Sequence, residues 1–289
     1  MDAILEMKNV NRDLKGFKLN DISLTLDKGY VMGLIGANGA GKTSVIKLIM
    51  NLLRKDSGSI NVFGMDHVKN EAEVKDRIGF VYDENIFPEQ LCLDRLGYLL
   101  SGFYSQWDQQ QFDSYLKRFE LNPRSKLSKL SKGMKMKFSI AAALSHHAEL
   151  IIMDVPTSGL DPVFRRELLD ILHYLMQDGE RSIIFSTHIT SDLDRIADII
   201  TLMDRGRIAM SIPFDKMVEH YRVIKGPKSL VEKIDPSWLC GTRINKFGFD
   251  ALCMEGGKIE REFGSAIVLE KPSIEDVMIY YSGKVGEQA

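Results

Sequence analysis

A glycine-rich segment at residues 36–43 restricts the fold of this chain more than any other feature. Its residues are Gly36, Ala37, Asn38, Gly39, Ala40, Gly41, Lys42 and Thr43, which match the spacing G-x-x-x-x-G-K-T. An apolar, β-branched run at 30–35 precedes the segment, and a helical pattern at 43–53 follows it. Glycines let a backbone wrap around a phosphate chain, and the N-terminus of the next helix adds a favourable dipole. The pattern therefore predicts a strand, a phosphate-binding loop and a helix in succession.

Apolar runs and helical patterns alternate beyond this segment. Strands are predicted at 78–82, 150–154, 182–186 and 199–203, and helices at 131–145 and 163–176. Alternating strands and helices indicate an α/β fold with a mostly parallel core sheet. Aromatic and amphipathic helical patterns fill residues 91–130, which predicts a helical insertion at about 85–145.

The pattern changes near Pro213. One helix is predicted at 214–221, followed by short strands with one short helix, and then by a final helix at 273–282. We therefore predict a main domain at 1–221 and a small α+β accessory or regulatory domain at 222–289, and we expect the latter to add a dimer contact.

Composition excludes several classes of protein. The net charge of -2 gives no whole-chain excess of Lys and Arg, so nucleic acid is not the expected partner. Apolar runs are far shorter than the roughly 20 residues that cross a bilayer, and the N-terminus lacks the pattern of a secretory signal. The three cysteines have no zinc-site spacing. Cytoplasmic residence is the expectation.

Several side chains are suited to binding a nucleoside triphosphate with Mg²⁺. Lys42 is placed to reach the β- and γ-phosphates, the Thr43 hydroxyl is a magnesium ligand, and Ser44 extends the phosphate site. Asp154 ends an apolar strand, where a carboxylate is suited to hold magnesium through water. Many buried strands end in Asp, so this residue gains its meaning from the phosphate-binding loop.

Three further motifs follow in order along the chain. They are Leu130-Ser131-Lys132-Gly133-Met134, Ser158-Gly159-Leu160-Asp161 and Ser186-Thr187-His188. The first is similar to the L-S-G-G-Q signature of ATP-binding cassette (ABC) proteins, the second resembles their D-loop, and the third resembles their switch histidine. The resemblance covers residues 1 to about 212 and implies a cassette that binds ATP and Mg²⁺.

The resemblance also implies that two cassettes pack head to tail with ATP between them. Ser131, Lys132, Gly133 and Met134 would then face the γ-phosphate bound by the opposite chain. A helix N-terminus with a hydroxyl is suited to that task, although the same residues fit an ordinary Ser-capped helix. Lys132 replaces the usual glycine and Met134 the usual glutamine; a cation at Lys132 still favours phosphate.

Val155 is the main departure from the family pattern. In the family a glutamate follows the magnesium-binding Asp and polarises the attacking water. Valine neither accepts a proton nor holds water by a hydrogen bond, so we expect impaired hydrolysis, with His188 and phosphate positioning leaving slow turnover. Two explanations stay open: a natural degenerate site beside an active partner, or a substitution that holds ATP in a closed dimer.

Two other positions depart from the pattern. Asp83 takes the place of the glutamine in the family's Q-loop; its carboxylate can approach magnesium, or it can form a solvated acidic pair with Glu84. Leu14 stands where the family places an aromatic residue under adenine. Phe17 is close by, and it either stacks on the base or packs in the core.

The whole-protein hypothesis is the motor subunit of an exporter of peptides or antimicrobial compounds. A separate transmembrane permease would dock on residues 85–128 and hold the chain at the inner face of the membrane. The alternatives are a cassette ATPase acting on ribosomes or DNA, which usually carries two cassettes or long coiled coils, and a nucleotide-binding regulator for which ATP is a structural ligand. The transported molecule is not encoded in these motifs.

Overall fold

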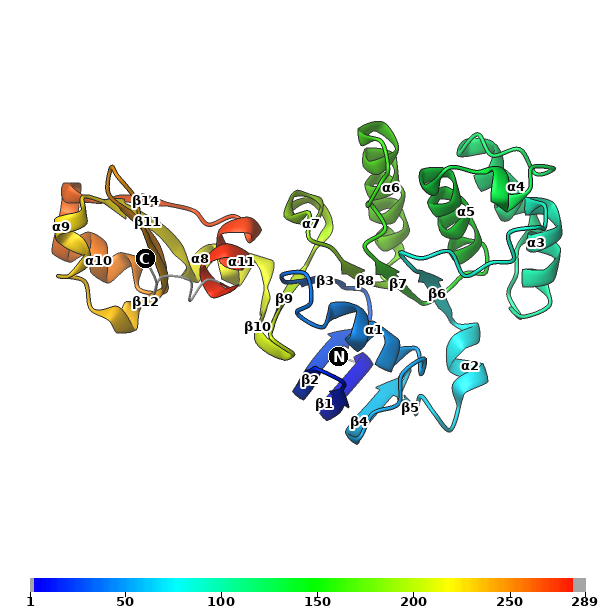
Figure 1. The fold of residues 1–289 in the computed structure, drawn as a ribbon, viewed down its shortest axis with the longest axis horizontal. Helices are drawn as coiled ribbons and strands as arrows, with labels where there is room; N and C mark the ends of the chain where they lie inside the picture. Colours follow the sequence, from blue (N-terminus) through cyan, green and yellow to red (C-terminus); the bar gives the residue numbers. More distant parts are fainter. Residues whose placement is uncertain (1–2, 283–289) are drawn as a thin grey trace.

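The centre of the molecule is a parallel sheet. The computed structural model describes residues 3–282, and this sheet has six strands in the order β10-β9-β3-β8-β7-β6 (Figure 1). Its strands are β3 (Val31–Ile35), β6 (Ile78–Val81), β7 (Leu150–Asp154), β8 (Ser182–Ser186), β9 (Ile199–Asp204) and β10 (Arg207–Pro213). All neighbouring pairs are parallel except β9 with β10. The predicted α/β class with a mostly parallel core is confirmed.

Helices cover this sheet. They are α1 (Lys42–Ile49), α5 (Lys132–Leu144), α6 (Pro162–Leu175, followed by the short turn η2, Met176–Asp178) and α7 (Thr190–Ile196). The predicted helix at 43–53 is too long, because α1 ends at Ile49. Asn51 adopts a positive φ of 52°, and the next amide, that of Leu52, bonds back to the Lys47 carbonyl at 2.8 Å. A left-handed residue of this kind terminates a helix.

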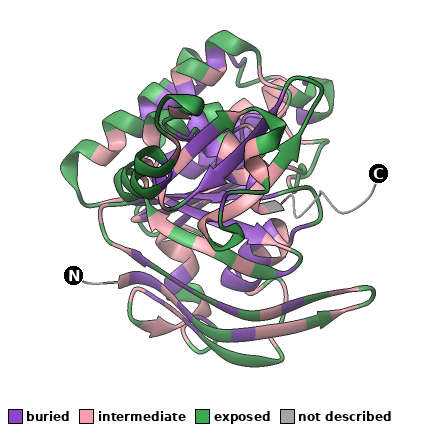
Figure 2. Cartoon of the chain, turned by 90° about the vertical axis from the view of Figure 1, so that its left-hand side faces the viewer, coloured by how far each residue is buried: buried purple, intermediate pink, exposed green. Residues whose placement is uncertain are grey.

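An antiparallel sheet that we did not predict packs beneath α1. Its order is β2-β1-β4-β5, formed by β1 (Ala3–Leu14), β2 (Phe17–Asp27), β4 (Ser57–Val62) and β5 (Met65–Asp66). Apolar residues of β1, β2 and β4 share one core with α1 and with one face of the parallel sheet. Figure 2 shows buried residues concentrated along the central strands, with the long β1–β2 hairpin extending below.

The helical insertion lies beside α5. It contains α3 (Leu93–Ser101), α4 (Gln109–Arg118) and the short turn η1 (Leu127–Lys129), while α2 (Glu71–Asp76) leads into β6. Phe112, Phe119 and Phe138 are fully buried between these helices. Gly97 permits the close approach, because a Cβ at that position would lie 2.4 Å from the Phe112 ring.

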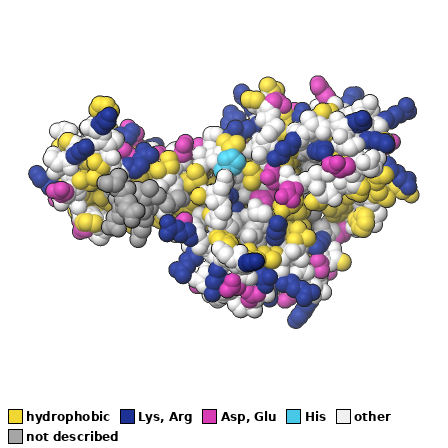
Figure 3. Space-filling model, viewed as in Figure 1, with side chains coloured by type: hydrophobic (Ala, Val, Ile, Leu, Met, Phe, Trp, Pro, Cys, Tyr) yellow, Lys and Arg dark blue, Asp and Glu magenta, His cyan; other side chains and the backbone are white. Residues whose placement is uncertain are grey.

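Residues after α8 (Phe214–His220) build a third sheet, ordered β12-β13-β11-β14. Its strands are β11 (Arg222–Gly226), β12 (Leu239–Ile244), β13 (Phe249–Cys253) and β14 (Val268–Glu270). Two helices, α9 (Lys228–Val231) and α10 (Gly256–Phe263), lie in this part with the turns η3 (Pro236–Trp238) and η4 (Gly264–Ala266), so the prediction of one short helix was wrong. Figure 3 shows the resulting smaller lobe joined to the larger one by a narrower waist.

The last helix, α11 (Ile274–Ser282), returns to the larger lobe and packs against α7 and β9. Ile274, Val277 and Tyr280 are buried in the same core as Leu193 and Ile200. The two lobes are therefore connected by apolar packing as well as by the chain. The division at residue 221 remains a prediction.

From residue 3 to residue 282, no helix combines the length and the apolar character needed to span a bilayer.

Replacing Gly79 by alanine tests the packing of β6 against α5. An added Cβ would lie 2.6 Å from the backbone carbonyl oxygen of Ala143, which cannot move without disturbing α5. We expect Gly79→Ala to lower the free energy of unfolding by about 1–3 kcal/mol in chemical denaturation. The matched control is Gly257→Ala on α10, where a Cβ meets nothing within 4 Å. Equal effects of the two substitutions would contradict this packing.

Candidate nucleotide-binding site

The glycine-rich loop joins β3 to α1, as predicted, and its backbone is closely packed. Gly36, Gly39 and Gly41 have positive φ values of 145°, 80° and 111°. A Cβ on Gly36 would lie 2.3 Å from the Met203 carbonyl oxygen. The backbone conformation favours glycine at all three positions, and at Gly36 and Gly41 the space also excludes a side chain.

Lys42 points back into this loop. Its side chain is buried, and Nζ donates to the carbonyl oxygens of Gly36 at 2.7 Å and Ala37 at 3.1 Å. Burial lowers the pKa of Lys42, and the nearby Asp154 carboxylate opposes that shift. The ammonium group is thus held by weak neutral acceptors in the space that the loop encloses, where phosphate oxygens would be stronger partners.

Asp154 lies at the carboxyl end of β7 and is only 1% exposed. Within the described part of the chain, its Oδ1 has no hydrogen-bond partner, and neither has the Oγ of Ser186. Burial raises the pKa of Asp154 and the like charge of Asp83 adds to the shift, whereas the Thr43 and Ser186 hydroxyls and Lys42 oppose it. Burying a carboxylate oxygen without a partner costs free energy unless a nearby cation compensates the charge.

These oxygens fit Mg²⁺ held jointly with a phosphate group. Among residues 3–282, no cluster of three or more His, Cys, Asp or Glu side chains could hold a metal by itself. Mg²⁺ is commonly bound by one or two protein oxygens together with substrate phosphates and water. Thr43 and Asp154 would supply the protein oxygens.

Ser186 contributes a buried polar group that was not predicted from the sequence. It ends β8 and pairs in register with Asp154 of the neighbouring strand. The signal was present, because polar residues that end adjacent parallel strands meet at the same sheet edge.

Val155 follows Asp154 in a left-handed conformation with φ of 50°. Its amide donates to the Ser186 carbonyl at 3.0 Å, and its own carbonyl accepts from the Ser158 amide at 3.2 Å. A β-branched residue is rare at positive φ, because its Cβ crowds the backbone. The surrounding hydrogen bonds therefore impose the conformation on a residue that does not favour it.

His188 lies just beyond β8, at the same edge of the sheet as Asp154, and is exposed. The preceding Thr187 donates its amide to the Leu34 carbonyl at 3.3 Å, and its hydroxyl accepts from the Ile189 amide at 2.9 Å. The backbone on both sides of His188 is thereby fixed, while its imidazole faces solvent.

Asp83 and Lys132 form an ion pair, with 3.2 Å between Oδ1 and Nζ. Lys135 and Glu89 form a second pair at 2.6 Å, so the segment after β6 is tied to the first turns of α5 at two points. Asp83, Lys132 and Lys135 border a pocket of about 360 Å³. Both Asp83 and Lys132 depart from the cassette pattern, and the structure brings the two departures together with opposite charge.

The residues of the predicted signature lie at the start of α5. Ser131 is its N-cap and accepts from the Met134 amide at 3.2 Å. A Cβ on Gly133 would lie 3.1 Å from the Gly159 carbonyl, so the predicted D-loop, Ser158 to Asp161, is directly adjacent. No hydrogen bond within the described residues joins 36–44 to 131–134.

Phe17 begins β2 and packs beside the phosphate loop. Its Cζ would lie 3.1 Å from a Cβ on Gly41 and 3.3 Å from one on Gly206. Leu14 is its partner across the hairpin. The ring thus borders the loop while contributing to the core, and both alternatives from the sequence remain compatible with its position.

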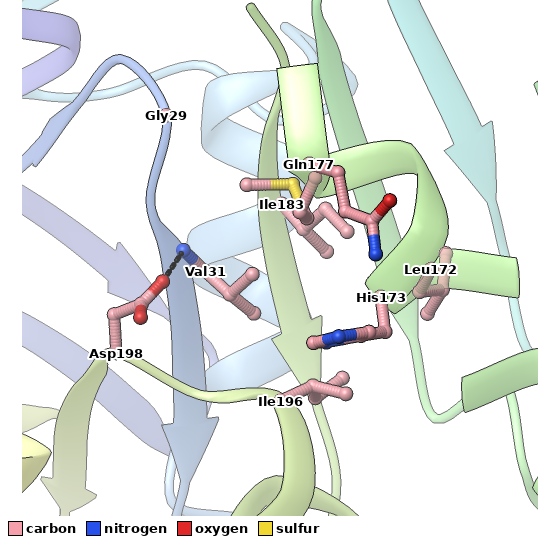
Figure 4. A pocket seen from close by; sticks show the side chains of 9 residues that line it. Gly29, Val31, Leu172, His173, Gln177, Ile183, Ile196 and Asp198 are labelled. Carbon is pink, nitrogen blue, oxygen red and sulfur yellow. Dashed lines mark hydrogen bonds between the residues drawn. The ribbon is translucent and has the colours of Figure 1, made fainter. Parts of the chain in front are cut away.

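A pocket of about 200 Å³ lies at the opposite edge of the parallel sheet (Figure 4). Val31 and Ile183 line it near the starts of β3 and β8, and Asp198 accepts a hydrogen bond from the Val31 amide at 2.8 Å. The phosphate loop follows the other end of β3. This pocket is therefore separate from the nucleotide site.

Comparison with known proteins identifies the family. A family model described as ABC transporter matches residues 19–158. The chain is 31% identical to the bacitracin transport ATP-binding protein BcrA of Bacillus licheniformis over 206 residues, which span 71% of this chain and 67% of that protein. It is also 31% identical to the ABC transporter ATP-binding protein NatA of Bacillus subtilis (strain 168), spanning 71% of this chain and 85% of NatA. The chain belongs to the ABC transporter family.

A solved structure agrees with this assignment. The structure described as the ATP binding subunit of an ABC transporter has a TM-score of 0.69 and 26% identity, covering 75% of this chain and 92% of that one. The protein is thus an ATP-binding subunit of this family of ATPases, as its motifs predicted.

Substituting Val155 tests whether its backbone is strained. Asparagine tolerates the left-handed region, so we expect Val155→Asn to raise the free energy of unfolding of this ABC subunit by about 1 kcal/mol. The control is Val163→Asn on α6, where the valine is exposed and does not have a positive φ. Chemical denaturation measures both, and a loss of stability in Val155→Asn alone would contradict the strain.

Proposed function

We propose that this ABC subunit is the ATP-driven motor of an exporter, working as a head-to-tail pair of cassettes on a separate membrane permease. The observation that carries the proposal is the buried Asp154 carboxylate, whose Oδ1 has no partner within the described residues. It lies beside Lys42 and Thr43 at the mouth of a phosphate-binding loop. Bacitracin transport by a relative favours peptides or antimicrobial compounds as cargo.

In this proposal the residues at the edge of the parallel sheet bind and orient ATP. Lys42 exchanges the carbonyls of Gly36 and Ala37 for phosphate oxygens, and Gly36 to Ser44 enclose the phosphates with backbone amides. Thr43 and Asp154 hold Mg²⁺, with Asp83 near enough to affect it electrostatically. Bound Mg²⁺ supplies neutralisation of the charge on the β- and γ-phosphate oxygens.

A second cassette completes the site. Ser131 and Lys132 are exposed at the N-terminus of α5, and Gly159 is exposed beside them. A helix N-terminus that carries a lysine side chain is suited to contact a phosphate from another molecule. Lys132 must then exchange its partner Asp83 for that phosphate.

The permease is proposed to dock on residues 85–128. Ile86, Tyr98, Leu99 and Phe103 are exposed in this segment, with Phe103 79% exposed, whereas Trp107 packs against the core. Large apolar side chains grouped on a surface are typical of a protein contact. Such a contact would hold the subunit at the inner face of the cell membrane.

Val155 makes impaired hydrolysis part of the proposal. It offers no proton acceptor, and its backbone is held in a left-handed conformation by Ser186 and Ser158. His188 remains available to contact the γ-phosphate. The same observation favours a second candidate, a non-transport regulator in which ATP binding stabilises the dimer without turnover.

Restoring a carboxylate separates the two candidates. We expect Val155→Glu to raise steady-state ATP hydrolysis by about 10²-fold, because a positioned general base contributes 10²–10⁴-fold. The unchanged chain should bind ATP with Mg²⁺ and dimerise without comparable turnover. Lys42→Ala in the Val155→Glu chain and removal of Mg²⁺ by chelation should each abolish the gain.

The opposite result has a clear meaning. If Val155→Glu dimerises with ATP but hydrolyses none, the missing base is not the only defect and the regulator becomes the better hypothesis. If neither chain binds ATP, the proposed function is wrong.

Docking is tested by fractionating cells that naturally produce the subunit. The double substitution Tyr98→Glu with Phe103→Glu should move the chain from the membrane pellet to the supernatant without changing its ATP affinity. The control pair is Val163→Glu with Tyr174→Glu, which changes two comparably exposed apolar residues on α6. Unchanged pelleting of the first pair would contradict docking on 85–128.

A further inference from the structure

Three segments at the nucleotide edge of the sheet meet at one buried carboxylate, Asp192 of α7. Asp192 is 1% exposed. Its Oδ2 accepts from the Thr157 hydroxyl at 2.9 Å, and its Oδ1 accepts from Nε of Arg165 at 2.5 Å. Arg165 also donates to Ser191 at 3.0 Å. The carboxylate therefore joins the loop after β7, the start of α6 and α7.

Each partner is close in the chain to a residue of the proposed hydrolysis site. Thr157 follows Val155 by two residues, and Asp192 follows His188 by four. The Asp192 amide bonds back to the Ile189 carbonyl at 3.3 Å, so a single turn separates it from His188. A shift of either loop would have to stretch or break the Thr157–Asp192 hydrogen bond.

The rest of α7 is packed against the sheet, so the backbone that carries Asp192 is held in place. Leu193 packs onto Gly33 of β3, where a Cβ would lie 2.7 Å from its Cδ1. On α6, Arg165 is partly buried and reaches Asp192 directly. Movement of the His188 turn is thereby tied to movement of the Val155 loop.

We propose that Asp192 is a positioning residue for ATP hydrolysis. Through its hydrogen bond with Thr157, Asp192 fixes the position of the His188 turn relative to the loop that contains Val155. This inference rests on the proposed function. Within the described residues, Asp192 makes no hydrogen bond with Lys42 or with the phosphate loop, so it acts on the chemical step and leaves ATP binding unaffected. Reaction rates are sensitive to small displacements of positioned groups.

The test uses the full chain carrying Val155→Glu, to which Thr157→Val or Thr157→Ser is added. Valine has nearly the shape of threonine but no hydroxyl, whereas serine retains the donor. We expect Thr157→Val to lower kcat by about 10-fold or more with KM for ATP changed by less than about 2-fold. Thr157→Ser should restore most of kcat.

A matched control breaks another contact on α6. Glu167 of α6 forms an ion pair with Arg118 of α4 at 2.6 Å. This pair does not involve α7. Glu167→Gln in the same parent should leave kcat and KM unchanged. A fall in kcat for Glu167→Gln equal to that for Thr157→Val, or a loss that serine does not restore, would show general damage to α6 and overturn the proposal.

Hydrogen exchange provides a readout that does not depend on turnover. In the nucleotide-free chain, Thr157→Val should speed amide exchange in 155–160 and 188–193 together, while α1 and the β1–β2 hairpin remain unchanged. If the parent fails to hydrolyse ATP, the proposed function falls and this exchange pattern alone decides the inference. Unchanged exchange in 188–193, or unchanged kcat in an active parent, would overturn it.

Discussion

The central constraint on this molecule is a carboxylate buried at the end of a parallel strand. Asp154 is desolvated, and its Oδ1 has no hydrogen-bond partner within residues 3–282. Burying such a group costs free energy unless a cation or donor compensates. The phosphate loop, Lys42 and the Thr43 hydroxyl lie around it. These groups are suited to bind the phosphates of ATP together with Mg²⁺.

An ion pair joins two residues that depart from the family pattern. Asp83 replaces a glutamine and Lys132 a glycine, and the structure pairs them at 3.2 Å. Exposed ion pairs contribute at most about 1 kcal/mol, so this pair is easily exchanged for stronger partners. The pair connects the segment after β6, where Asp83 influences Asp154, with the start of α5.

The sequence predicted the buried parallel strands best and the antiparallel parts worst. Strands β7 and β8 have the predicted bounds, because a short apolar run that ends in a polar residue has few alternatives. The β1, β2 and β4 strands were missed, since residues 3–27 and 57–62 have no continuous apolar run. Pairing stabilises these strands, and β4 pairs with β1 across a large separation in sequence. The helix at 43–53 was overextended because the left-handed turn at Asn51 is not visible in a hydrophobic pattern.

The sequence by itself determined the phosphate loop, the α/β class, the family and the identity of the residues that end β7 and β8. These follow from local spacing and from the chemistry of single side chains. Only the tertiary structure decided that Oδ1 of Asp154 has no partner within the described residues, that Asp83 meets Lys132, that Val155 is held at positive φ, and that Asp192 joins Thr157 to Arg165. The physical reason is that burial, strain and pairing depend on groups that are distant in the chain and adjacent only after folding.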